Sequence, residues 1–175
     1  GTAGALLGCG GGGGNAGGAV SGGPPPPTAA LVEGQPLPTL ASLPNTSADP
    51  MHFAASLSAA PSQLPLLTGS RTDLWLYNGA FPGPLIELRE GQRFSVRVDN
   101  RLPIDTTVHW HGLAVPPDQD GSPMDPIASG STRTYTFDVP VGSAGTYWYH
   151  PHAHQTTALQ VARGLAAPLI VRGSD

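Results

Sequence analysis

Residues 94–99 read Phe-Ser-Val-Arg-Val-Asp, an alternation of apolar and polar side chains with a period of two. Successive side chains of an extended chain point to opposite faces, so this pattern predicts a strand with one buried and one solvent-facing side. Turn signals bound the segment, with Glu90-Gly91 before it and the loop over residues 100–105 after it. This half-buried strand is the clearest indication that the chain has a β fold.

Comparable strand signals lie on both sides of this segment. Apolar, aromatic and β-branched runs bounded by turn residues predict strands over residues 74–77, 85–88, 106–110, 132–139, 145–150 and 169–171. One or two helical turns fit residues 155–164, which end at a glycine. With neither βαβ alternation nor an internal repeat, the pattern predicts an all-β fold, an antiparallel Greek-key β-sandwich.

The first 50 residues differ in composition from the rest of the chain. Glycine dominates positions 1–23, four prolines follow directly, the only acids are Glu33 and Asp49, and no aromatic residue occurs. Such a stretch buries too little apolar surface to offset the entropy that it loses on ordering. We therefore expect residues 1–50 to be a disordered leader or linker, and residues 51–175 to form the folded domain.

Cys9 is the only cysteine of the chain, which excludes an internal disulfide and a thiolate ligand within the predicted domain. Its context, Leu-Leu-Gly-Cys over residues 6–9, resembles a bacterial lipobox, in which the cysteine becomes the lipidated N-terminus. A Gly/Pro-rich tether after that cysteine suits a lipoprotein of the cell envelope. A chance cysteine in low-complexity sequence remains the alternative, because the basic start of a signal peptide is missing.

The charge pattern excludes one class of partner. Only 11% of the residues are charged, the formal net charge is −4, and the sequence contains neither a basic patch nor a lysine-rich stripe. Binding to nucleic acid therefore has no electrostatic support. The longest apolar runs also fall short of the ~18 residues that a transmembrane helix needs.

Histidines gather in two short windows, residues 109–112 (His-Trp-His-Gly) and residues 150–154 (His-Pro-His-Ala-His), while His52 stands alone. Residues i and i+2 of an extended chain share a face, so each His-x-His motif presents two imidazoles to one point in space. Neighbouring strands of a sandwich would then bring four nitrogen ligands together. These candidate ligands are His109, His111, His150 and His152.

A set of imidazoles without a thiolate or an obvious carboxylate partner favours copper or zinc. A closed structural zinc site normally includes cysteine, which the predicted domain lacks. A single His-x-His motif also fits two ordinary sheet histidines, whereas two motifs beside glycines and aromatic residues favour a shared metal site. Trp110 and Trp148 are interpreted as core residues that shield this site from water.

With these motifs, the stretch from Asn78 to Val171 resembles the first domain of the multicopper oxidases, which include laccases, bilirubin oxidases and copper-efflux oxidases. The matching pieces, in family order and spacing, are Asn78-Gly79-x-x-Pro82-Gly83-Pro84, His109-Trp110-His111-Gly112-Leu113, Asp120-Gly121, Gly145-Thr146-Tyr147-Trp148-Tyr149-His150-Pro151-His152 and Gln160-Val161-x-x-Gly164-Leu165. The resemblance implies a cupredoxin-like fold. It also implies an activity that couples one-electron oxidation of a phenolic, bilirubin-like or cuprous substrate to four-electron reduction of dioxygen to water.

The resemblance further implies roles for single residues. His109 would bind the type 2 copper of a trinuclear cluster, His111 and His150 one type 3 copper, and His152 the other, with His154 outside the ligand pattern. Asp120 matches an acid that helps to deliver protons to reduced oxygen. Asp118 is the alternative for that role, and both acids also fit a solvated turn.

The resemblance stops at the type 1 copper, which needs a thiolate ligand in a His-Cys-His motif that this sequence lacks. We therefore expect a fragment of an extracytoplasmic oxidase, periplasmic or attached to the envelope, that is inactive alone. Later cupredoxin domains, of the same polypeptide or of another subunit, would bind the small reducing substrate.

Three alternatives remain open at this point. One is a natural single-domain protein that assembles its site between subunits. Another is a non-enzymatic copper-binding or copper-carrying envelope protein. The third is a zinc hydrolase, since a catalytic zinc site needs only three protein ligands and an open position.

Overall fold

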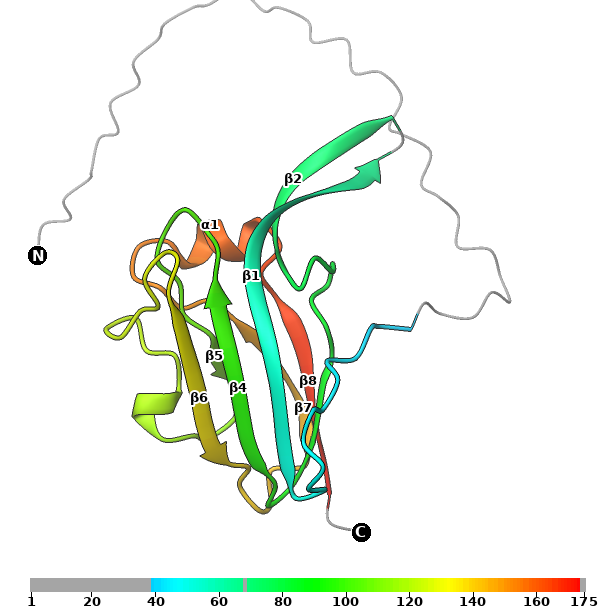
Figure 1. Cartoon of the computed structure of the whole chain (residues 1–175), viewed down its shortest axis with the longest axis vertical. Coiled ribbons are helices and arrows are strands. Elements are labelled where there is room, and N and C mark those ends of the chain that lie inside the picture. Colours follow the sequence, from blue (N-terminus) through cyan, green and yellow to red (C-terminus); the bar gives the residue numbers. More distant parts are fainter. Residues whose placement is uncertain (1–38, 68, 174–175) are drawn as a thin grey trace, which may run out of the picture. The chain divides into compact units, whose positions relative to one another are not determined.

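A computed structural model describes residues 39–67 and 69–173, so Cys9 and the leader up to residue 38 lie outside the described residues. Two four-stranded β-sheets pack face to face, as Figure 1 shows. The strands are β1 (His52–Leu67), β2 (Ser70–Tyr77), β3 (Ile86–Arg89), β4 (Arg93–Asn100), β5 (His109–His111), β6 (Thr132–Asp138), β7 (Gly145–His150) and β8 (Ala167–Arg172), and the helices are the 3-10 helix η1 (Pro117–Gln119) and α1 (Thr157–Ala162).

The strand order is β2-β1-β4-β6 in one sheet and β3-β8-β7-β5 in the other. The predicted β-sandwich is therefore confirmed. Most neighbours are antiparallel, but β1 pairs with β4 and β3 pairs with β8 in parallel. These parallel pairs, which the sequence pattern did not predict, arise because the chain crosses to the other sheet between the paired strands.

The core lies between the sheets and is rich in aromatic rings. Phe94 and its alternating neighbours Val96 and Val98 are fully buried, as predicted for a half-buried strand. The ring of Phe94 lies 4.6 Å from that of Phe137 in its own sheet and 4.8 Å from that of Trp110 in the facing sheet. Trp110 therefore joins the two layers at the middle of the sandwich.

The long strand β1 was not predicted from the sequence. Its 16 residues bury Phe53, Ala55, Leu57 and Ala59 on one side, which is the expected alternation. Two of these four positions are alanine, whose small side chain contributes little to a hydrophobic pattern. The strand is stabilised instead by its place between β2 and β4.

Residues 39–50, which the sequence analysis assigned to the disordered leader, are ordered in the structure, and this part of the expectation is corrected. The backbone N–H of Leu43 donates to the Leu85 carbonyl at 2.8 Å, and that of Thr46 donates to the Ala54 carbonyl at 2.8 Å. The side chain of Leu43 is buried in the core. The buried Leu43 side chain and backbone hydrogen bonds hold this segment in place, although the segment contains no aromatic residue.

The predicted helix is confirmed as α1, which is followed by Gly164 with a φ of +114°. The expected strand over residues 106–110 is shorter and shifted, since only β5 pairs with β7 and Thr106 makes an isolated bridge to Ile127. No helix in residues 39–67 and 69–173 is long and apolar enough to cross a bilayer.

The loop between β5 and β6 packs tightly on the strand that it follows. Gly121 in this loop has a φ of +67°, and a Cβ atom built there would overlap the backbone carbonyl of Val108. Glycine is therefore required at this position for space as well as for conformation. Gly142 has a similar φ of +83°, but a Cβ atom there would meet nothing within 4 Å.

These two glycines form a matched pair for a stability test. Gly142→Ala should lower the free energy of unfolding by about 1–2 kcal/mol, the cost of a left-handed alanine. Gly121→Ala should cost roughly 1–3 kcal/mol more, because the loop must also move away from Val108. Urea denaturation of both variants measures the difference, and equal losses would contradict the tight packing of this loop.

Candidate metal centre

Alternation along β5 decides which way its histidines point. Trp110 is fully buried and packs on Phe94 and Tyr135, with ring centroids 4.8 and 5.6 Å away. Its neighbours on both sides, His109 and His111, must therefore lie on the opposite face of the sheet, away from the core. His111 is exposed and His109 is half-buried.

The register of β5 against β7 brings the second window to the same face. His109 pairs with His150, and His111 pairs with Trp148. Side chains that are directly opposite in an antiparallel pair share a face and lie close together. Three imidazoles and one indole thus form a block of four neighbouring side chains on the outer face of β5 and β7.

The rings of the four predicted histidines lie close together, and three of them bring ligand nitrogens to one point. The ring of His109 lies 5.5 Å from that of His111, 5.4 Å from that of His150 and 5.3 Å from that of His152, measured between centroids. His111 Nδ1 lies 3.1 Å from His150 Nε2. Ligand nitrogens of His109, His111 and His150 all fall within 4.8 Å of one another.

His152 lies beyond the end of β7, and a buried threonine holds its backbone in place. The N–H of His152 donates to Thr107 Oγ1 at 2.7 Å. The adjacent Thr106 Oγ1 donates to Gln160 Oε1 at 2.6 Å, and Gln160 Nε2 donates to the Asp105 carbonyl at 2.9 Å. These buried polar contacts tie the chain before β5 to the chain after β7, so they set the spacing between the two histidine windows.

Two backbone carbonyls fix the protonation of the imidazoles. His109 Nδ1 lies 2.9 Å from the Asp120 carbonyl, and His150 Nδ1 lies 2.8 Å from the Pro151 carbonyl. Because a carbonyl only accepts hydrogen bonds, the proton of each neutral ring belongs on Nδ1. Nε2 is then the nitrogen through which both rings can bind a metal ion, which is the usual arrangement of metal-binding histidine. At His150 the ion would replace the contact between Nε2 and His111 Nδ1.

His150 is held in the neutral form that binds metals. Burial lowers its pKa, the Pro151 carbonyl opposes this by raising it, and the neighbouring imidazoles of His109, His111 and His152 lower it further. The ring is thus uncharged near pH 7.

Asp120 lies beside the histidines, whereas the hydrogen bonds of Asp118 within the described residues go to Gln119 and Arg133. Asp120 Oδ1 is 3.1 Å from His109 Nδ1 and buried, but it makes no hydrogen bond within the described part of the chain, because the ring proton is directed to the Asp120 carbonyl. A pocket of about 280 Å³ is lined in part by His109, Asp120 and His152. Asp118 accepts a hydrogen bond from Gln119 instead.

Arg133 holds the loop that carries both acids. Its Nη2 donates to the Asp118 carbonyl at 2.6 Å, and its Nη1 forms an ion pair with Asp125. The guanidinium also lies over the ring of Tyr135, 5.0 Å from the centroid. The loop is therefore fixed at one end of β6, close to the histidine cluster.

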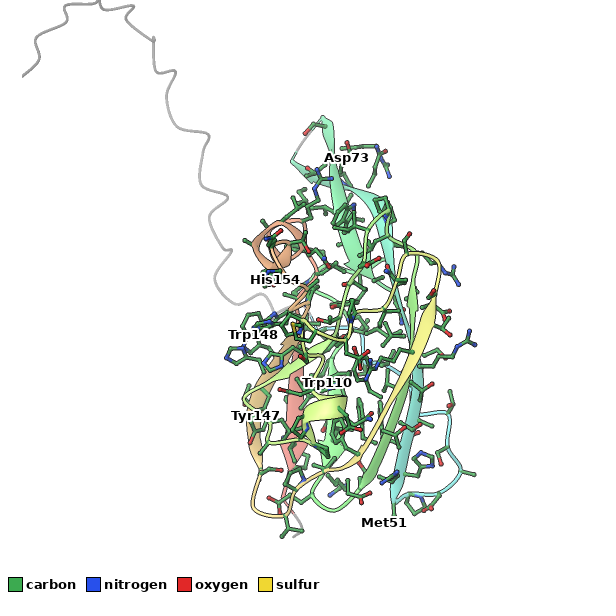
Figure 2. The ribbon with its side chains drawn as sticks, turned by 90° about the vertical axis from the view of Figure 1, so that its left-hand side faces the viewer. Met51, Asp73, Trp110, Tyr147, Trp148 and His154 are labelled. Carbon is green, nitrogen blue, oxygen red and sulfur yellow. The ribbon has the colours of Figure 1, made fainter. Side chains whose placement is uncertain are left out.

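The other two histidines do not join the cluster. His154 lines a different pocket together with Asp105 and Thr156. His52 begins β1, directly after Met51, and Figure 2 shows Met51 at the far end of the domain from His154. Both positions agree with the sequence interpretation, which left these residues out of the ligand set.

Sequence reasoning missed or misplaced several residues around the site. Thr106, Thr107 and Gln160 carried only a strand or helix signal, since nothing in a sequence reveals which buried polar side chains meet. Trp148 was expected in the core, but its side chain is 38% exposed on the outer face, while Trp110 is indeed buried. The alternation of β7 could have predicted this position, because Trp148 lies two residues before His150 and therefore on the same face of the strand.

Comparisons with known proteins identify relatives of the whole domain. The multicopper oxidase family model matches residues 59–175. Copper resistance protein A of Pseudomonas syringae pv. tomato is 38% identical over 112 residues, which is 62% of this chain and 17% of that protein. The multicopper oxidase mco of Staphylococcus haemolyticus is 42% identical over 98 residues, which is 56% of this chain and 22% of that protein. The chain thus spans about a fifth of the length of these relatives.

Solved structures show the same fold. A multicopper oxidase from Campylobacter jejuni, described as a metallo-oxidase, matches with a TM-score of 0.77 and 45% identity over 79% of this chain and 30% of that chain. A multi-copper oxidase from Pediococcus acidilactici matches with a TM-score of 0.74 and 36% identity over 80% of this chain and 30% of that chain. Fold, motifs and sequence identity together show that this chain comprises one cupredoxin-type domain and belongs to the multicopper oxidase family.

Proposed function

We propose that this chain acts as the first domain of an oxidase that transfers electrons from a small reducing substrate to dioxygen, and that His109, His111, His150 and His152 hold copper. The convergence of His109, His111 and His150 on the outer face of β5 and β7 carries the proposal. The ring of His152 lies 5.3 Å from that of His109. Water is the proposed product of dioxygen reduction.

The donor atoms fit copper in number, type and spacing. His111 Nδ1 and His150 Nε2 are 3.1 Å apart, a separation that both can keep while bonding one ion at about 2.0–2.1 Å each. An all-nitrogen set suits copper, and the family of the chain is one of copper enzymes. We assign His111 and His150 to one type 3 copper, His152 to the other, and His109 to the type 2 copper. Copper bound there would supply one-electron redox chemistry.

The protein groups around the site have separate tasks. The Asp120 and Pro151 carbonyls orient the rings of His109 and His150 through their Nδ1 protons. The Asp120 carboxylate has a buried oxygen without a hydrogen-bond partner among the described residues, and it borders the pocket at His109 and His152. We propose that this carboxylate takes a proton from water in the pocket and delivers it to reduced oxygen.

The remaining parts of the proposal concern the whole protein. The substrate, phenolic, bilirubin-like or cuprous, would bind to later cupredoxin domains that also provide the type 1 copper. We further propose an extracytoplasmic location, periplasmic or at the envelope, with residues before the domain as a tether and Cys9 as its lipid attachment site. The lipobox-like context of Cys9 supports this last step.

Copper titration of the chain tests the assignment of the ligands. The chain should bind Cu²⁺ with nitrogen ligation visible by electron paramagnetic resonance, and without an intense thiolate-to-copper absorption band, since its only cysteine is Cys9. His150→Ala should weaken binding by about tenfold or more, in the range found for groups that support a metal site. His154→Ala is the matched control and should leave the affinity unchanged. Equal effects of the two variants would contradict the assignment.

The role of Asp120 is tested in the oxidase that carries this domain. Asp120→Asn keeps the size of the side chain and the backbone carbonyl that orients His109, but it removes the proton-carrying group. Turnover with dioxygen should fall by about 10²-fold or more, as expected when a general acid or base is lost, while the copper content stays the same. Asp118→Asn should retain activity. A loss of copper from the Asp120 variant would show a role in metal binding instead.

A further inference from the structure

The fourth corner of the histidine block is occupied by Trp148. This residue lies directly opposite His111 across the strand pair and two positions before His150 on β7. We propose that Trp148 is a positioning residue: its indole holds the rings of His111 and His150 in the orientation that makes their ligand nitrogens converge. The inference rests on the proposed role of these two histidines as copper ligands.

The Trp148 indole lies closer to the imidazoles of His150 and His111 than the spacing of residues in the strands requires. The ring centroid of Trp148 is 4.0 Å from that of His150 with an interplanar angle of 27°, and 4.9 Å from that of His111 with an angle of 35°. Positions two apart on a strand are separated by about 6.6–6.8 Å along the chain. The side chains of Trp148 and His150 must therefore lean toward each other to stack, and the same indole also touches the opposite imidazole.

His111 depends on this contact more than His150 does. The His109 and His150 rings are each fixed by a carbonyl at Nδ1. Within residues 39–67 and 69–173, the only hydrogen bond of the His111 ring is the one from its Nδ1 to His150 Nε2. A metal ion bound to both nitrogens replaces this hydrogen bond, and rotation about χ2 of histidine is intrinsically loose. Stacking on Trp148, at 4.9 Å, is then the shortest ring contact that remains to hold the His111 ring.

The exposure of Trp148 separates this role from a role in folding. Its side chain is 38% exposed, compared with 7% for Trp75 and 0% for Trp110, and Figure 2 shows it at the surface. A large aromatic side chain that is partly in water contributes less to the core than its size permits. Loss of the indole should thus affect the ligand rings more than the stability of the sandwich.

Three variants of the chain test the proposal with Cu²⁺ as the probe. Trp148→Val keeps a good strand former but removes the ring, and should weaken Cu²⁺ binding by about tenfold, since the aromatic contacts to both imidazoles are lost. Trp148→Phe keeps a stacking ring and should stay within about threefold of the wild type. Tyr147→Val removes a ring from the opposite face of β7 and is the control.

The expected pattern combines affinity with spectroscopy. The electron paramagnetic resonance spectrum of bound Cu²⁺ should change in Trp148→Val and be restored in Trp148→Phe, while the melting temperature of Trp148→Val stays close to that of the wild type. Wild-type affinity in Trp148→Val would overturn the inference. A similar loss of affinity in Tyr147→Val would also overturn it, because general destabilisation would then explain the effect. A wild-type chain that binds no Cu²⁺ would instead refute the proposed function on which the inference depends.

Discussion

The burial of Trp110 is the constraint on which the site depends. Its ring belongs to β5 but packs against the phenyl ring of Phe94 in the facing sheet. Burying about 150–250 Å² of aromatic surface at about 25 cal/mol per Å² stabilises this orientation by roughly 4–6 kcal/mol. A shift of β5 by one residue would expose Trp110 and drive both flanking histidines into the core, so the same interaction that closes the sandwich also aims the imidazoles outward.

The second requirement is that the two histidine windows meet. The register of β5 and β7 places His150 opposite His109. Buried hydrogen bonds fix the segment that follows β7, since Thr106 donates to Gln160 and Thr107 accepts from the His152 N–H. Buried polar groups of this kind are costly unless every partner is present. The spacing of the imidazoles is thus stabilised by interactions deep in the domain, while the rings themselves lie at its edge.

The sequence predicted the parts of this arrangement that follow from local periodicity. The alternation of Phe94, Val96 and Val98 predicted a half-buried strand, and the i, i+2 spacing predicted that His109 and His111 share a face. The sequence suggested that neighbouring strands carry the two histidine windows, but it did not predict the register of β5 against β7, because register is a long-range property. The strand β1 and the anchor Leu43 were missed, since alanine-rich or isolated apolar positions give weak signals. The stack of Trp148 on His150 depends on side-chain rotamers, which no sequence pattern specifies.

The central claim is that the outer face of β5 and β7 binds copper through the clustered imidazoles. The most direct measurement is a crystal structure of the copper-loaded chain, with the ion located by anomalous scattering at the copper edge. We expect a copper peak between His111 Nδ1 and His150 Nε2, whose present separation is 3.1 Å. Copper bound at His154 or His52 with that gap left empty would contradict the account.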